Sequence, residues 1–188
     1  MVPLTELWLP ILLSAVFVFI VSSILHMVIP IHKDDFAKLP GEEKLLDAMR
    51  AQNLQPGSYA FPSADSMKDM GTPEMIEKCN TGPVGIMTVT ASGPPAMGKY
   101  LSMWFIYSIF IGIFVAYIAG LGLAHGAEFW PVFRMTAAAA ILGYAASSVV
   151  DSIWKYQRWG ITMRFVFDGL LYGLATALAF AWLWPDAA

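Results

Sequence analysis

The chain has 188 residues, of which 57% are hydrophobic and 13% are charged, and its formal net charge is −3. This composition is too apolar for an ordinary soluble domain, and the apolar residues occur in long blocks, as is typical of an integral membrane protein. The small net charge and the lack of a basic cluster argue against nucleic acid as a partner. The single cysteine, Cys79, excludes an intrachain disulfide and a multi-cysteine metal site.

The first predicted element is a membrane helix within residues 1–29. Its apolar block runs from about residue 7 to residue 29, which is long enough to cross a hydrocarbon core of ~30 Å. A cleaved signal peptide is the competing interpretation. It is disfavoured because no Lys or Arg precedes the block and no small-residue cleavage pattern follows it.

Residues 30–99 form a more polar insertion. The acidic pair Glu42-Glu43 and the apolar stripe that follows predict one short amphipathic helix up to Leu54, and Thr72-Pro73-Glu74 predicts the start of a second. Residues 59–61 and 86–90 are strand-like in composition, so we also expect a small β-ribbon. The insertion is too apolar for a disordered linker and too small to fold alone.

Residues 100–188 contain three further apolar blocks, at about 100–122, 131–150 and 163–184. Together with the first block they predict an all-α integral membrane protein with four transmembrane helices. No internal repeat accompanies them.

Small residues recur at four-residue spacing on the last three of these helices. Residues four apart lie on one helix face, so each series predicts a smooth seam against which another helix can pack closely. The predicted seam residues are Gly112, Ala116, Gly120, Gly143, Ser147, Gly169, Gly173 and Ala177.

The basic residues predict the orientation. With four spans, residues 30–99 share a side with the loop near Arg158, and that side carries every Lys and Arg except Arg134. The positive-inside rule then predicts a cytoplasmic insertion and two periplasmic termini, in a bacterial inner membrane.

Four ionisable residues are expected at a similar depth near the cytoplasmic side: His26, Asp151, Arg164 and Asp168. Ionisable groups within membrane segments usually pair with one another or line a cavity. The favoured interpretation of this intramembrane polar cluster is a structural clasp, in which Arg164 pairs with Asp168 or Asp151. A proton or ion relay and a contact with lipid or a partner are the alternatives.

No catalytic or metal site is predicted, because the sequence lacks a nucleophile elbow, a zinc-protease helix and a phosphate-binding loop. No cofactor is predicted either. Haem or pigment contact stays open through a single histidine, since His26 and His125 are expected near opposite faces and His32 lies outside the first helix. The methionines of the insertion match no copper site.

Several segments resemble an uncharacterised family of small multi-pass bacterial inner-membrane proteins. They are Ser22–Met27, Gly93–Lys99, Asp168–Gly173 and Trp182–Pro185. The resemblance implies a bacterial inner membrane, and it brings no activity, ligand or catalytic residue.

The function expected from the sequence is non-catalytic. The small-residue seams, and an insertion too small to fold alone, favour an accessory or scaffolding subunit of a larger membrane complex. An energy-converting complex of respiration or photosynthesis is an example. Its partners would be membrane lipids and other membrane subunits. The alternative is a small transporter or proton-conducting protein that uses the His/Asp cluster.

Overall fold

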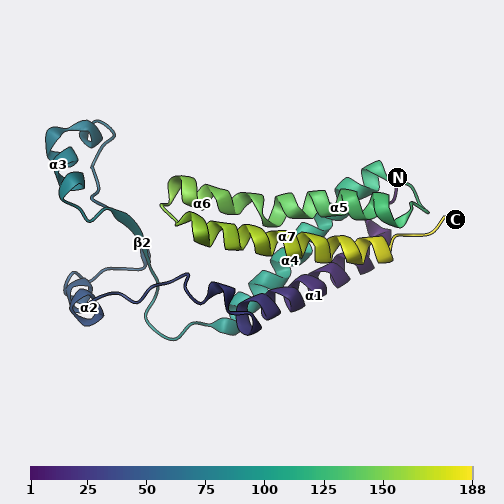
Figure 1. The fold of residues 1–188 in the computed structure, drawn as a ribbon, viewed down its shortest axis with the longest axis horizontal. Helices are drawn as coiled ribbons and strands as arrows, with labels where there is room; N and C mark the ends of the chain where they lie inside the picture. Colours follow the sequence, from purple (N-terminus) through teal and green to yellow (C-terminus); the bar gives the residue numbers. More distant parts are fainter. Residues whose placement is uncertain (188) are drawn as a thin grey trace. The chain divides into compact units, whose positions relative to one another are not determined.

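The computed structural model describes residues 1–187 and divides the chain into two compact units. The first is a helical bundle made of Met1–Phe36 and the chain from Ala96 onward, and the second is the insertion, Ala37–Pro95 (Figure 1). Residues 30–36, which the sequence analysis assigned to the insertion, lie with the bundle.

The bundle contains four helices that are long and apolar enough to span a membrane, which confirms the predicted multi-pass helical class. The first is α1 (Trp8–Ser23), which continues through a π-helical turn (Ile24–Val28), and the second is α4 (Met97–Gly122). The third combines α5 (Phe129–Tyr144), a 3-10 turn (Ala146–Ser148) and α6 (Val149–Trp154), and the fourth is α7 (Trp159–Trp182).

The predicted small-residue seams are occupied inside the bundle itself. A Cβ added at Gly169 would lie 2.7 Å from the Cα of Ala145, and Gly173 is equally close to Ile141, so α7 packs tightly on α5. Gly112 on α4 faces Ser14 and Ile11 of α1 less closely, since a Cβ added there would lie 3.2 Å from Ser14 Oγ and 3.3 Å from Ile11 Cγ2.

The remaining seam residues follow this pattern with one exception. Four of them are buried or in close contact with another helix or with the N-terminal segment: Ala116, Gly120, Gly143 and Ala177. Ser147 is exposed, because it lies in the 3-10 turn, whose tighter winding takes it off the line of the α5 seam.

Both described ends of the chain lie at one end of the bundle (Figure 1). The backbone N–H of Val2 donates to the carbonyl of Gly120, and that of Gly126 donates to Pro185. The indole Nε1 of Trp184 donates to the carbonyl of Ala124 at 2.9 Å. This arrangement is the one that four antiparallel spans require. Trp184 is buried in this arrangement, with 8% of its surface exposed.

The insertion contains the expected short helices and ribbon. Its elements are α2 (Glu42–Ala51), β1 (Gly57–Phe61), α3 (Pro73–Thr81) and β2 (Gly85–Val89), and the two strands pair antiparallel with Tyr59 opposite Met87. The Thr72 hydroxyl accepts a hydrogen bond from the Met75 backbone N–H and caps α3, as its sequence predicted.

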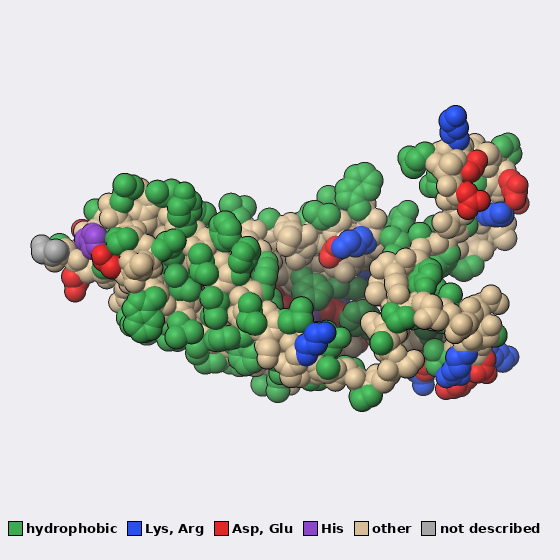
Figure 2. Space-filling model, turned by 180° about the vertical axis from the view of Figure 1, so that it is seen from behind, with side chains coloured by type: hydrophobic (Ala, Val, Ile, Leu, Met, Phe, Trp, Pro, Cys, Tyr) green, Lys and Arg blue, Asp and Glu red, His purple; other side chains and the backbone are tan. Residues whose placement is uncertain are grey.

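The outer surface of the bundle is apolar. Figure 2 shows hydrophobic side chains covering the bundle on the face in view, whereas Lys, Arg, Asp and Glu side chains gather mainly over the insertion. Exposed aromatic and aliphatic side chains such as Ile106, Phe110 and Phe114 lie along α4. A surface of this kind is suited to contact with lipid.

Candidate functional site

The candidate site begins where the first membrane helix ends. At Ile24 the helix loosens into a π-helical turn, closed by the hydrogen bond from the Ile29 N–H to the Ile24 carbonyl. Ile29 is extended, as the residue before a proline prefers to be, and Pro30 ends the helix and opens a 3-10 turn. The chain therefore turns sharply, and His32 comes to lie next to His26.

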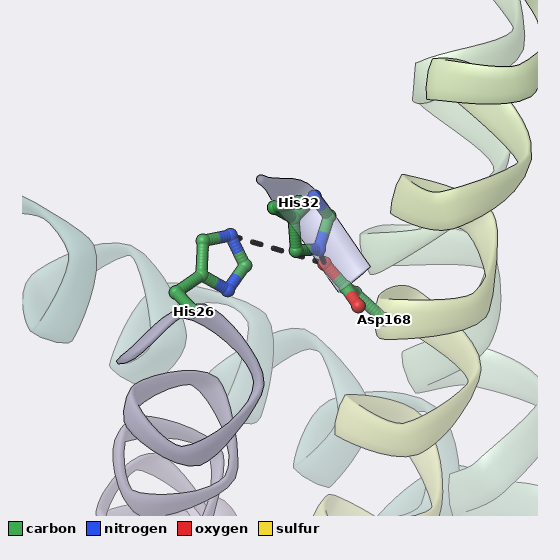
Figure 3. A group of neighbouring side chains, drawn as sticks. All are labelled: His26, His32 and Asp168. Atoms are coloured by element: carbon green, nitrogen blue, oxygen red, sulfur yellow. Dashed lines mark ion pairs between the residues drawn. The ribbon is translucent and has the colours of Figure 1, made fainter. Parts of the chain in front are cut away.

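Three side chains converge at this turn (Figure 3). His26 comes from the π-helical turn, His32 from the 3-10 turn and Asp168 from α7. The His32 Nε2 atom lies 2.9 Å from Asp168 Oδ2, and the His26 Nε2 atom lies 3.9 Å from the same oxygen. The two imidazole rings are stacked, with centroids 4.3 Å apart and an interplanar angle of 23°.

A second carboxylate orients His32 from its other side. The His32 Nδ1 atom lies 2.7 Å from Asp35 Oδ2, and the guanidinium of Arg164 donates from Nε to Asp35 Oδ1 at 2.7 Å. Burial raises the pKa of Asp35, but the hydrogen bonds from His32 and Arg164 outweigh it, so its pKa is held below the ordinary value. Asp35 is therefore an ionised acceptor, and His32 Nδ1 must donate to it.

The two buried carboxylates of this group, Asp35 and Asp168, differ in the positive charge that faces them. Asp35 is only 4% exposed and is balanced by Arg164, whereas Asp168 is 1% exposed and faces two imidazoles instead of a permanent cation. Neither Asp168 oxygen, nor His32 Nε2, has a hydrogen bond of acceptable geometry within residues 1–187. A buried carboxylate without partners is costly, so this part of the site is the one most in need of a cation or proton.

The structure brings together three of the four residues predicted for the polar cluster. His26 and Asp168 are neighbours, and Arg164 joins them through Asp35 and His32. The expected direct pairing of Arg164 with Asp168 or Asp151 is replaced by the pair with Asp35.

Asp151 lies apart from this group. Its carboxylate pairs with Lys155 at 2.7 Å on α6 and its side chain is 38% exposed. Asp151 was expected beside the other three residues because of its similar depth along the span. The 3-10 turn at Ala146–Ser148 changes the register of the chain before Asp151, which explains the difference.

Sequence reasoning missed His32 and Asp35, because both follow the end of the first membrane helix and were assigned to the insertion. A signal was present in the spacing: His32 and Asp35 are three residues apart, directly after the helix-breaking Pro30. The third histidine, His125, lies 2.7 Å from Glu6 near the chain termini, at the end of the bundle away from His26. His125 is therefore too far from His26 to bind the same ligand.

These features define a multi-pass helical membrane protein with a buried polar cluster at one end of its bundle. No family model matches the chain, and neither a curated protein nor a solved structure is detectably similar to it.

Proposed function

We propose that this protein is an accessory subunit of a larger membrane protein complex in a bacterial inner membrane, for example an energy-converting complex. Its bundle would anchor the insertion at the cytoplasmic surface, where the insertion would bind another subunit. The observation that carries this proposal is the lack of a hydrophobic core within the insertion.

The insertion has regular structure but little interior. Within Ala37–Pro95 the one buried side chain is Met75, at 7% exposure. An isolated two-stranded ribbon is only marginally stable in water, and short helices need an apolar face to pack against. Exposed large apolar side chains on the insertion are Leu39, Leu45, Met67, Met70, Ile76, Val84 and Ile86. Apolar surface of this extent on an ordered segment favours a protein partner.

The packing of the bundle narrows the location of the partner contact. The small-residue seams first suggested a surface for other helices, but these seams are filled by α1, α4, α5 and α7 themselves. A partner would therefore have to contact the insertion or the lipid-facing side chains. The concentration of Lys and Arg in residues 30–99 supports a cytoplasmic position for the insertion.

Substitutions on the insertion test this proposal. The full-length tagged chain would be extracted from native membranes in mild detergent, and its companions would be quantified for the wild type and for Ile76→Glu and Ile86→Glu. Both side chains are at least 42% exposed, so the substitutions should leave the bundle folded. The expected result is a companion at fixed ratio that is lost in both variants and retained in Glu77→Gln. Companions that are absent, or equally retained in all variants, would refute the proposal.

A second function is favoured by one observation: the continuous polar series Arg164, Asp35, His32, Asp168 and His26 within a membrane bundle. Such a series is suited to a small transporter or proton-conducting protein. Its test is proton flux into liposomes, read with a pH-sensitive dye. Flux that is lost in Asp168→Asn and retained in Asp151→Asn would support this function over the first, and equal background flux in all samples would exclude it.

A further inference from the structure

The side chains of His26, His32 and Asp168 have the composition and spacing of a metal site. One ligand atom from each lies within 4.8 Å of the other two. We propose that these three residues bind a divalent first-row transition metal ion, such as Zn²⁺ or Fe²⁺. The proposal concerns the bundle and does not depend on whether the protein is a subunit of a complex.

The distances fit coordination of one ion. Imidazole nitrogens and carboxylate oxygens bind Zn²⁺ at about 2.0–2.2 Å, so two ligand atoms on one ion are about 3.0–3.5 Å apart. The observed separations of 2.9 Å for His32 Nε2 to Asp168 Oδ2, and 3.9 Å for His26 Nε2 to the same oxygen, lie on either side of this range. The two rings are stacked and only 23° from parallel, so His26, which is 44% exposed, must turn out of the stack to direct its Nε2 lone pair at the ion.

The hydrogen bonding of His32 supports metal binding independently of the ligand distances. Its Nδ1 donates to the Asp35 carboxylate, so in the neutral ring the Nε2 atom carries a lone pair that is directed toward the Asp168 carboxylate. Two acceptors at 2.9 Å repel one another unless a proton or a metal ion lies between them. Metal-bound histidines usually donate their second N–H to a carboxylate in this way, which fixes the tautomer and raises the basicity of the ligand nitrogen.

The buried polar atoms supply a further observation. Asp168 is 1% exposed, and both of its carboxylate oxygens lack a hydrogen-bond partner among residues 1–187, as does His32 Nε2. A bound ion would satisfy these atoms and would offset the negative charge that Asp168 leaves in the cluster. Because Arg164 already balances Asp35, it does not perform this role.

The donor set limits the kind of ion. Two imidazoles and one carboxylate suit zinc, iron, nickel or copper better than Mg²⁺ or Ca²⁺, which prefer oxygen ligands alone. Three protein ligands leave at least one coordination position for water or another small ligand, and His26, which is 44% exposed, lies at the accessible side of the group.

Metal analysis of the full-length protein tests this site directly. The chain, carrying Cys79→Ser to remove its exposed thiol, would be stripped with a chelator, reloaded with Zn²⁺ and dialysed, and its metal content measured. The expected result is one tightly held ion per chain. His26→Ala and Asp168→Asn should weaken binding by at least the ~10–100-fold that loss of an outer-shell partner costs. His125→Gln should bind like the parent, since His125 lies at the other end of the bundle.

A measurement on the unsubstituted ligands avoids dependence on variant folding. Co²⁺ loaded into the parent protein should give visible absorbance, and X-ray absorption should show two imidazoles with oxygen and no sulfur. The proposal is overturned if less than a stoichiometric amount of metal binds, if His26→Ala binds as tightly as the parent, or if one imidazole or none is found. Any of these results would leave the cluster as a hydrogen-bonded clasp.

Discussion

The tight packing of α7 on α5 can be tested with the substitution Gly169→Ala. A Cβ at this position would lie 2.7 Å from both the Cα and the Cβ of Ala145, and 2.8 Å from its backbone nitrogen. Two of these three atoms belong to the backbone and the third is a Cβ, which is fixed to it, so a side-chain rotation cannot relieve the clash and the two helices must separate. Overpacking of this kind costs roughly 1–3 kcal/mol.

The same helix provides the control. Gly160 is also part of α7, and a Cβ added there would meet no atom within 4 Å. Gly160→Ala should therefore be neutral or stabilise the protein by up to about 1 kcal/mol, because alanine loses less backbone entropy on folding.

Thermal unfolding in mild detergent, followed by tryptophan fluorescence, measures both changes. For a chain of this length, 1 kcal/mol corresponds to about 2–4 °C in Tm, so Gly169→Ala should lower Tm by roughly 2–12 °C. Gly160→Ala should not lower it. Equal shifts in the two variants would show that the α5–α7 contact is not as close as described and would refute the reasoning.

Three further predictions concern the cluster and the other end of the bundle. Arg164→Met should lower the free energy of unfolding by roughly 1–3 kcal/mol in chemical denaturation, because it leaves the Asp35 carboxylate buried without its cation. Adding Asp35→Asn to this variant should recover part of the lost stability. If the double variant recovers none, Arg164 and Asp35 are not paired as described. The pKa of Asp35 is lowered in the folded protein, so the ionised carboxylate stabilises the fold fully above the unfolded-state pKa of about 3.9. This stabilisation is lost as the pH falls through the lower pKa of the folded state. Acid unfolding curves of Asp35→Asn should lack this pH-dependent loss of stability. Trp184→Phe should lower stability by roughly 0.5–1.5 kcal/mol through loss of its indole hydrogen bond, whereas Trp182→Phe, at a 65% exposed position, should change stability less; similar losses would argue against the buried position of Trp184.

The membrane helices were predictable because their signal is local. Continuous apolar blocks of sufficient length have few other folded states available, and the Gly169 and Gly173 spacing indicates a packing face without knowledge of the partner helix. In the insertion, Thr72 and Pro73 likewise fix a helix start through local hydrogen bonding.

The polar cluster was only partly predictable because it depends on departures from regular helix. The π-helical turn and Pro30 bring His32 back to Asp168, and no periodicity in the sequence encodes that return. The 3-10 turn after α5 has the opposite effect, since it removes Asp151 from the face on which a regular helix would have placed it. In both cases a local departure from α-helical geometry decides which ionisable side chains meet.

The most direct test of the accessory-subunit proposal is the composition of the particle that the unmodified protein forms in its own membrane. Gentle detergent extraction, followed by size separation and quantitative identification of every chain present, would give this composition. The account predicts a large particle in which this chain is present at a fixed ratio to at least one other membrane subunit. If the chain is recovered alone or as a small homo-oligomer, the accessory-subunit function is wrong.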